Sequence, residues 1–164
     1  MTTPPSDLTT DVEAPRDAAA LFRTHRVPMA RLAFVLTGRS AVADEIVQEA
    51  FLKVHQNWPR LDNPIGYLRV AVVNGCHTFH RRRIVEERHA IHVGPPPPEA
   101  VNEGLGDVGH ALARLPERQR TALALRYLLD LSDNDIAVAL DVRPATVRSL
   151  IRRGLAALRQ DIEK

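Results

Sequence analysis

The sequence predicts an all-α protein with two small helical domains, residues 18–92 and 110–164, joined by a flexible Pro/Gly-rich linker. Of its 164 residues 45% are hydrophobic but only 4% are aromatic, so the core must rely on Leu, Val, Ile and Ala, which favour helices over a β-sandwich. Apolar residues recur at steps of three and four in both halves. Between them, residues 93–109 read VGPPPPEAVNEGLGDVG, and four consecutive prolines favour an extended polyproline conformation.

The first predicted helix follows an acidic segment, residues 1–17, that we expect to be a disordered tail. Its apolar stripe covers residues 18–36, and Pro28 within it must mark a kink or a short break. The dipeptide of Thr37 and Gly38 ends this helix.

The second predicted helix starts at Ser40, whose hydroxyl can cap it. Asp44 and Glu45 are then expected in its first turn, where the helix dipole favours acids. Trp58 and Pro59 stop it, and we expect Trp58 to pack against the core rather than to stack on a base.

The third predicted helix has Asn63 as its cap and Pro64 at its first helical position. Its apolar stripe consists of Ile65, Leu68, Val72, Cys76 and Phe79. We expect about four turns, ending in the three consecutive arginines of residues 81–83.

The second half is predicted to contain four helices. A short one ends before Pro116, and Pro116 opens the next. Ser132 caps a third, which has two acids in its first turn, and a tight turn at residues 141–143 leads to Pro144 at the start of the last helix. A short capped helix, a tight turn and a longer helix together predict a helix-turn-helix.

The charges are segregated along the chain, although the net charge is only +2. Residues 21–93 carry eleven basic and six acidic side chains, and residues 111–164 carry ten basic and seven acidic ones. The segments before and between these blocks each have a net charge of −3. Two basic modules of this kind are typical of proteins that meet a polyanion, and solvated helix faces are the other interpretation.

The last predicted helix carries the most specific signal. Residues 143–159 contain five arginines and no acid, and Arg148 and Arg152 share a face opposite the apolar stripe. Thr146 and Ser149 place small hydrogen-bonding groups near its amino end, which is the part of a recognition helix that reaches base edges. Arginine can bridge guanine O6 and N7 with two hydrogen bonds. Because a capped helix and a tight turn precede this helix, we expect DNA binding rather than a merely solvated basic face.

Three motifs of the second half resemble the carboxy-terminal domain of bacterial extracytoplasmic-function (ECF) sigma factors of the sigma-70 family. They are LPERQRTALALRY at 115–127, LSDNDIA at 131–137 and ATVRSLIRRGLAALR at 145–159. The first half independently resembles the amino-terminal domain of that family, in LTG at 36–38, DEIVQEAFLKV at 44–54 and NPIGYLRVAVVN at 63–74. The resemblance covers about residues 18–88 and 107–161, in the expected order and with the expected linker.

The resemblance implies a function and a set of partners. It implies a sigma factor that binds core RNA polymerase, through the β′ clamp helices and the β flap, and directs initiation at promoters with −10 and −35 elements. A polar face would dock on the clamp helices, and its residues are Asp44, Glu45, Gln48, Glu49 and Lys53. On composition alone, a solvated helix face is the favoured interpretation of these residues.

The DNA contacts that the resemblance implies fall into two sets. At the −10 element they are Asp62, Asn63, Tyr67, Arg69, Asn74 and His77, with Arg81, Arg82 and Arg83 on phosphates. At the −35 element they are Arg143, Thr146, Arg148, Ser149, Arg152 and Arg153. An exposed tyrosine on a basic helix suits single-stranded DNA, although Tyr67 could equally lie at the edge of the core.

Three positions depart from the usual pattern of the family. Thr78 stands where an Asp is frequent, Asp141 stands where the turn frequently has Gly, and Gly154 replaces an Ala in the last helix. We expect Asp141 to adopt the left-handed turn conformation. Gly154 is expected to be exposed, at a cost of about 1 kcal/mol.

No motif predicts catalysis or a cofactor. Cys76, His77 and His80 on one helix could in principle bind a metal, but Cys76 falls on the apolar stripe and is expected to be a core residue. There is no Gly-rich phosphate loop and no GxSxG motif. We therefore expect no enzymatic activity and no metal site.

A single cysteine, no signal peptide and no long apolar run predict a cytoplasmic protein without membrane insertion. The resemblance also implies an anti-sigma partner that holds both halves together and competes with core polymerase. The alternative is an autonomous helix-turn-helix regulator that binds DNA without polymerase, although the first half has neither a ligand-pocket signature nor a long dimerisation heptad. An enzyme with an incidental helix-turn-helix is a third possibility.

Overall fold

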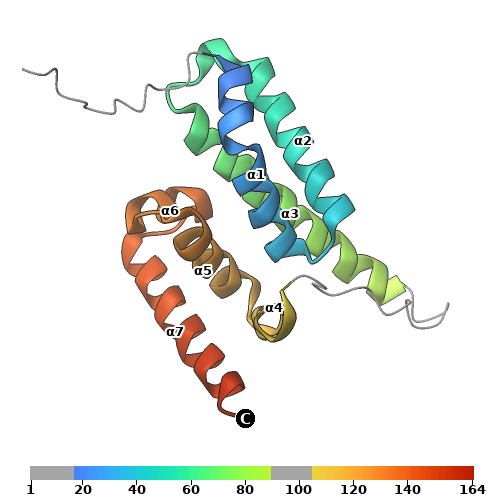
Figure 1. Ribbon diagram of the computed structural model, residues 1–164, viewed down its shortest axis with the longest axis vertical. Coiled ribbons are helices and arrows are strands. Elements are labelled where there is room, and N and C mark those ends of the chain that lie inside the picture. The colour runs from blue at the N-terminus through green and yellow to red at the C-terminus, as the bar shows by residue number, and fades with distance from the viewer. Residues whose placement is uncertain (1–16, 90–104) are drawn as a thin grey trace, which may run out of the picture.

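The computed structural model describes residues 17–89 and 105–164, and within these ranges every regular element is a helix (Figure 1). The elements are α1 (Ala18–Thr37), α2 (Ser40–Asn57), the short 3-10 helix η1 (Trp58–Arg60), α3 (Pro64–His89), α4 (Gly106–Arg114), α5 (Glu117–Leu129), α6 (Asp133–Leu140) and α7 (Pro144–Ile162). The all-α class is thereby confirmed.

The first three helices form one packed unit, with α1 against both α2 and α3. The Asp17 side chain caps α1 by accepting a hydrogen bond from the Ala20 amide at 2.7 Å, and α1 runs through Pro28 without a break. Gly38 ends α1 with φ of 73°, a left-handed conformation that glycine adopts at no steric cost. The predicted end of this helix is confirmed.

Two expectations for the start of α2 are wrong by a few residues. Arg39 occupies the cap position, and Ser40 is already helical. The first turn therefore contains no acid, and Asp44 and Glu45 lie one turn further on, exposed to solvent. Trp58 ends α2 as predicted and packs against the core.

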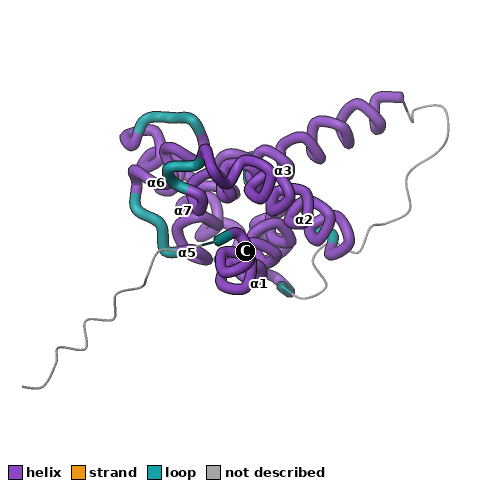
Figure 2. The backbone as a smooth tube through the Cα atoms, turned by 90° about the horizontal axis from the view of Figure 1, so that it is seen from above, coloured by secondary structure: helices purple, strands orange, loops and turns teal. Residues whose placement is uncertain are grey.

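The start of α3 is as predicted, but its end is not. The Asn63 side chain accepts a hydrogen bond from the Gly66 amide at 3.1 Å, and Pro64 is the first helical residue. The helix continues beyond residues 81–83 to His89, because residues 84–89 contain no Pro or Gly that would stop it. Its last turns extend away from the rest of the molecule (Figure 2).

The second unit contains α4 to α7, and α4 begins at Gly106, inside the range expected for the linker. Ser132 caps α6 by accepting a hydrogen bond from the Asp135 amide. Asp141 ends α6 in the left-handed region with φ of 53°, as predicted for the turn before α7. The helix-turn-helix is therefore built as the sequence predicts.

Gly154 is buried, and the expectation that it would be exposed is wrong. A Cβ at this position would lie 2.8 Å from the Leu123 Cδ1 atom of α5. The absence of a side chain lets α7 approach α5 closely, and α5 and α7 are indeed packed against each other. Glycine serves here as a packing residue between helices.

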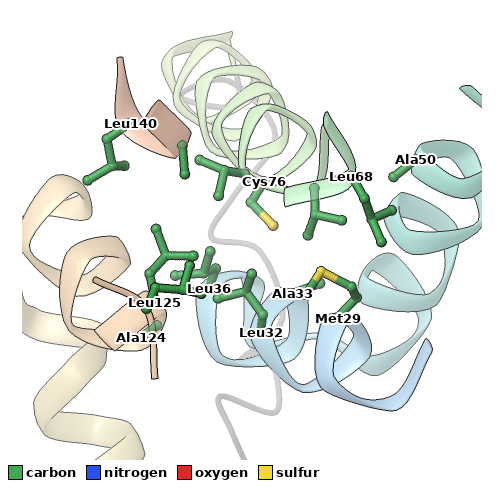
Figure 3. Close-up of a cluster of buried hydrophobic side chains, with 14 of the residues drawn as sticks. Met29, Leu32, Ala33, Leu36, Ala50, Leu68, Cys76, Ala124, Leu125 and Leu140 are labelled. Atoms are coloured by element: carbon green, nitrogen blue, oxygen red, sulfur yellow. The ribbon is translucent and has the colours of Figure 1, made fainter. Parts of the chain in front are cut away.

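The two units pack directly on each other through a continuous hydrophobic core. Helix α1 lies against α5, and α3 lies against α6. Figure 3 shows Leu36 and Cys76 from the first unit facing Leu125 and Leu140 from the second. Each unit therefore covers part of the other's surface.

Candidate nucleic-acid interface

The arginines of α7 lie on the face that points away from the core. Val147 and Leu150 are buried toward α5 and α6, which leaves the opposite face to solvent. The exposed members of the predicted −35 set are Arg143, Arg148, Arg152 and Arg153, while Thr146 and Ser149 are half-buried. Helix α7 and its N-cap residue Arg143 thus present four guanidinium groups to solvent, and such groups can contact DNA phosphates and guanine edges.

A hollow of about 500 Å³ lies beside this face, between α5 and α7. Its polar lining consists of Arg126, Tyr127, Asp133, Arg148, Arg152 and Arg159. The Asp133 carboxylate accepts from Arg126 on one oxygen and from Arg148 on the other, the latter at 3.4 Å. An acid of α6 therefore contacts one of the predicted base-reading arginines.

The predicted −10 residues divide into an exposed group and a covered group. Asp62, Asn63, Tyr67, Asn74, Arg81 and Arg82 are exposed, whereas Arg69, His77 and Arg83 are partly buried. Asn63 also caps α3, so its side-chain oxygen already holds the Gly66 amide. The Arg83 guanidinium lies 3.7 Å from the Glu87 carboxylate and 5.9 Å from the centre of the Phe79 ring.

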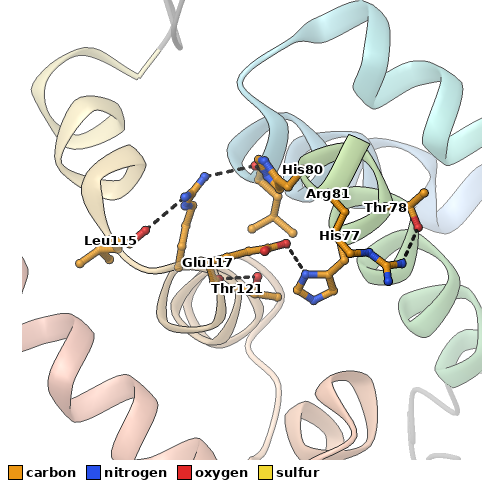
Figure 4. Close-up of polar contacts among 9 residues, drawn as sticks. His77, Thr78, His80, Arg81, Leu115, Glu117 and Thr121 are labelled. Carbon is orange, nitrogen blue, oxygen red and sulfur yellow. Dashed lines mark hydrogen bonds and ion pairs between the residues drawn. The ribbon is translucent and has the colours of Figure 1, made fainter. Parts of the chain in front are cut away.

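Arg69 and His77 are only partly exposed, and a residue of the second unit acts on each of them. The Arg69 Nε atom is buried without a hydrogen-bond partner, and burial lowers the pKa of this guanidinium, an effect that Asp135 of α6 opposes. His77 pairs with Glu117 of α5 (Figure 4). The second unit therefore contacts the His77 side chain directly and acts on Arg69 through the charge of Asp135.

Two further polar contacts meet at the end of α1, and the one from Arg120 of α5 joins the two units (Figure 4). The Leu36 carbonyl accepts from His80 Nε2 at 2.6 Å and from Arg120 Nη1 at 3.4 Å. Burial lowers the pKa of Arg120, and Glu117 opposes this. The contact combines a hydrophobic core with charged hydrogen bonds.

The predicted docking face on α2 is fully presented to solvent. Asp44, Glu45, Gln48, Glu49 and Lys53 are all exposed, and the Lys53 ammonium lies 3.7 Å from Glu49. Leu52, on the same side of the helix, is 54% exposed and was not predicted as part of this face. Leu52 adds apolar area that could be buried if a partner binds this face.

Comparison with known proteins agrees with this layout. The model of Sigma-70 region 2 matches residues 21–84, and that of Sigma-70 region 4 matches residues 105–158. The ECF RNA polymerase sigma factor SigE of Mycolicibacterium smegmatis is 31% identical to the chain, over 96% of this chain and 66% of SigE. The chain belongs to the ECF group of the sigma-70 family.

This sigma factor is similar to other relatives over most of their length. The RNA polymerase sigma-E factor of Streptomyces coelicolor is 26% identical, over 85% of this chain and 82% of the relative. SigL of Mycobacterium tuberculosis is 28% identical, over 88% of both chains. The function is therefore that of the family: binding RNA polymerase and directing promoter-specific initiation, and the alternative of an autonomous regulator is not favoured.

Two solved structures share the fold of the sigma factor. RpoE of Bartonella quintana, in a complex with the anti-sigma factor NepR, gives a TM-score of 0.70 at 18% identity, over 87% of this chain and 96% of RpoE. CnrH, in a complex with the cytosolic domain of CnrY, gives 0.71 at 19% identity, over 89% and 87% of the two chains. At these identities the likeness concerns the fold.

Leu52, Glu117 and Asp133 are the residues of interest that sequence reasoning missed. Leu52 follows Glu45 and Glu49 at helical spacing, so the sequence alone could have placed this apolar residue on the polar face. Glu117 and Asp133 act through contacts with distant residues, which periodicity does not reveal. Among the residues that the structure describes, no group of His, Cys, Asp and Glu could hold a metal, and no helix is long and apolar enough to cross a membrane.

Proposed function

We propose a division of labour between three surfaces of this sigma factor. Exposed α2 residues around Gln48 dock on the β′ clamp helices of core polymerase, and the second unit meets the β flap. The loop before α3 and its exposed polar residues contact the −10 element, and the arginine face of α7 contacts the −35 element. The observation that supports this best is the exposed α7 face within a chain that matches sigma-70 regions 2 and 4.

The two units must separate for all these contacts to form. In this packed, closed arrangement His77 pairs with Glu117 of α5, and Arg69 is partly buried with Asp135 of α6 acting on it, so the access of a −10 element to both is restricted. Core polymerase that binds the open form more tightly than the closed one would shift the equilibrium toward it. The covering of the −10 residues is thus a control on promoter binding.

The anti-sigma partner is a related proposal. One structural neighbour, RpoE of Bartonella quintana, is a sigma factor in a complex with the anti-sigma factor NepR, which supports a partner of that kind for this chain. A protein that grips both units stabilises the closed form and competes with core polymerase. Excess partner added to a mixture with core polymerase should therefore reduce holoenzyme, and unchanged holoenzyme would contradict the proposal.

The place and chemistry of action follow from this role. The sigma factor works in the cytoplasm, where polymerase and DNA are, and it catalyses no reaction itself. Bond formation between nucleotides belongs to the polymerase that it directs.

Site-specific crosslinking tests the division of labour. A photo-crosslinking amino acid replaces Gln48 in one variant and Ser149 in another, and each is assembled with core polymerase and promoter DNA. We expect the probe at Gln48 to label the β′ subunit and the probe at Ser149 to label DNA near −35. A probe at Glu163, at the exposed end of the chain beyond α7, serves as the control. The assignment would be overturned if the probe at Gln48 labelled DNA, or if the probe at Ser149 labelled no DNA.

A further inference from the structure

The three helices of the helix-turn-helix region meet on one carboxylate, that of Asp133. Its Oδ1 atom accepts from Arg126 Nη2 of α5, and its Oδ2 atom accepts from Arg148 Nη1 of α7 at 3.4 Å. The side chains of Arg126 and Asp133 are each 30% exposed, whereas that of Arg148 is 62% exposed. The Arg126–Asp133 ion pair is thus partly buried, whereas Arg148, which contacts the same carboxylate, is exposed.

Stability does not explain the outer contact. An exposed ion pair contributes about 0–1 kcal/mol, because solvent screens it and both side chains lose conformational freedom. The second unit is held instead by its buried core, in which Leu125, Ile136 and Val147 are fully inaccessible. What the Asp133 contact does supply is restriction of a long side chain that would otherwise sample many rotamers.

The anchor for this restriction is rigid. Asp133 is the first residue of α6, directly after the Ser132 cap, so its backbone is fixed. Arg126 occupies the other carboxylate oxygen and fixes the side chain as well. A guanidinium has five N–H donors, so one bond to Asp133 leaves enough donors for a two-bond contact with guanine.

We propose that Asp133 is a positioning residue, which holds the Arg148 guanidinium in the orientation that reads one base pair of the −35 element. This rests on the proposed function of α7. Asp133 also places a negative charge beside the DNA-binding face, which weakens binding to phosphates of any sequence. Both effects increase the ratio of specific to non-specific binding.

Selection from a DNA library tests this with the complete holoenzyme. The probe is double-stranded DNA with a randomised −35 hexamer upstream of a fixed −10 element. For Asp133→Asn we expect the preference at one base pair to fall about tenfold, while affinity for unrelated DNA at the same salt concentration rises. Arg148→Ala should lose preference at the same base pair, and the double variant should lose no more than Arg148→Ala alone.

Two further variants separate positioning from folding. Asp135→Asn removes the same charge from the same helical turn, but Asp135 acts on Arg69 rather than on Arg148, so the preference should persist. Asp133→Glu keeps the carboxylate and should restore part of the preference. A normal preference in Asp133→Asn, or a further loss in the double variant, would overturn the positioning role. If Arg148→Ala changed the base preference at no position of the hexamer, both the positioning role and the proposed function of α7 would be contradicted.

Discussion

The buried environment of Cys76 strongly lowers the reactivity of its thiol. Cys76 is 2% exposed, and burial raises its pKa to about 12, with Glu117 adding to the effect. Because the thiolate is the reactive form, the folded protein should resist alkylation by iodoacetamide at pH 8 and react fully once unfolded in urea. Mass spectrometry of the two samples measures this. Equal rates in both states would contradict the burial of Cys76.

The arginines of α7 carry the next prediction at this scale. Replacing Arg148 or Arg152 by Ala should cost about 1–3 kcal/mol in binding to a −35 element if the side chain reads a base. A variant of an arginine outside the six predicted −35 residues, Arg118→Ala on α5, is the control. Fluorescence anisotropy of labelled promoter DNA at fixed salt gives the affinities. Unchanged affinity in both α7 variants would remove α7 from the recognition role.

Helix α2 is the element whose role can be tested most simply. Reversing the charge of Asp44, Glu45 and Glu49 together should weaken binding to core polymerase, because all three are exposed on the predicted docking face. The same reversal at Glu86, Glu87 and Glu163, which are also exposed, is a control with an equal change in net charge. Co-purification with core polymerase measures holoenzyme formation. If both triple variants bind alike, the docking face lies elsewhere.

Sequence reasoning succeeded for elements whose signals are local. The cap at Asn63, Pro64 at the first helical position and the left-handed turn at Asp141 depend on neighbouring residues, and all three were predicted. The end of α3 was missed because residues 84–89 contain no Pro or Gly, and Glu86, Glu87 and Arg88 among them are good helix formers.

Contacts between distant residues could not be predicted. Gly154 is buried only because α5 packs on it, and His77 pairs with a residue forty positions away. The composition of the candidate surfaces was therefore predictable, whereas the covering of Arg69 and His77 was not. That covering depends on how two units pack, which periodicity within one helix does not encode.

At the scale of the whole molecule, two partly buried histidines make stability depend on pH. Burial lowers the pKa of His80 below its ordinary value of 6.5, with Arg120 and Arg83 acting in the same direction and the Leu36 carbonyl and Glu117 opposing them. Burial and Arg69 also lower the pKa of His25. Below pH 6.5 the unfolded chain therefore binds more protons than the folded one, and the free energy of unfolding falls until the pH drops below the folded pKa values.

Urea unfolding at pH 7.5 and 5.5 measures this effect. We expect lower stability at pH 5.5 and a smaller difference between the two pH values for His80→Gln. Replacing the exposed His55 in the same way should leave the difference unchanged. A wild-type protein that is equally stable at both pH values would contradict the burial of these rings.

In vitro transcription tests the central claim, that this chain directs RNA polymerase to promoters, most directly. Core polymerase from the same organism is incubated with fragmented genomic DNA, with and without the purified sigma factor, and the 5′ ends of the transcripts are sequenced. The sigma factor should produce start sites that share two upstream elements at a constant spacing, and the variant with the α2 charge reversal should not. Start sites identical to those of core polymerase alone would contradict the claim.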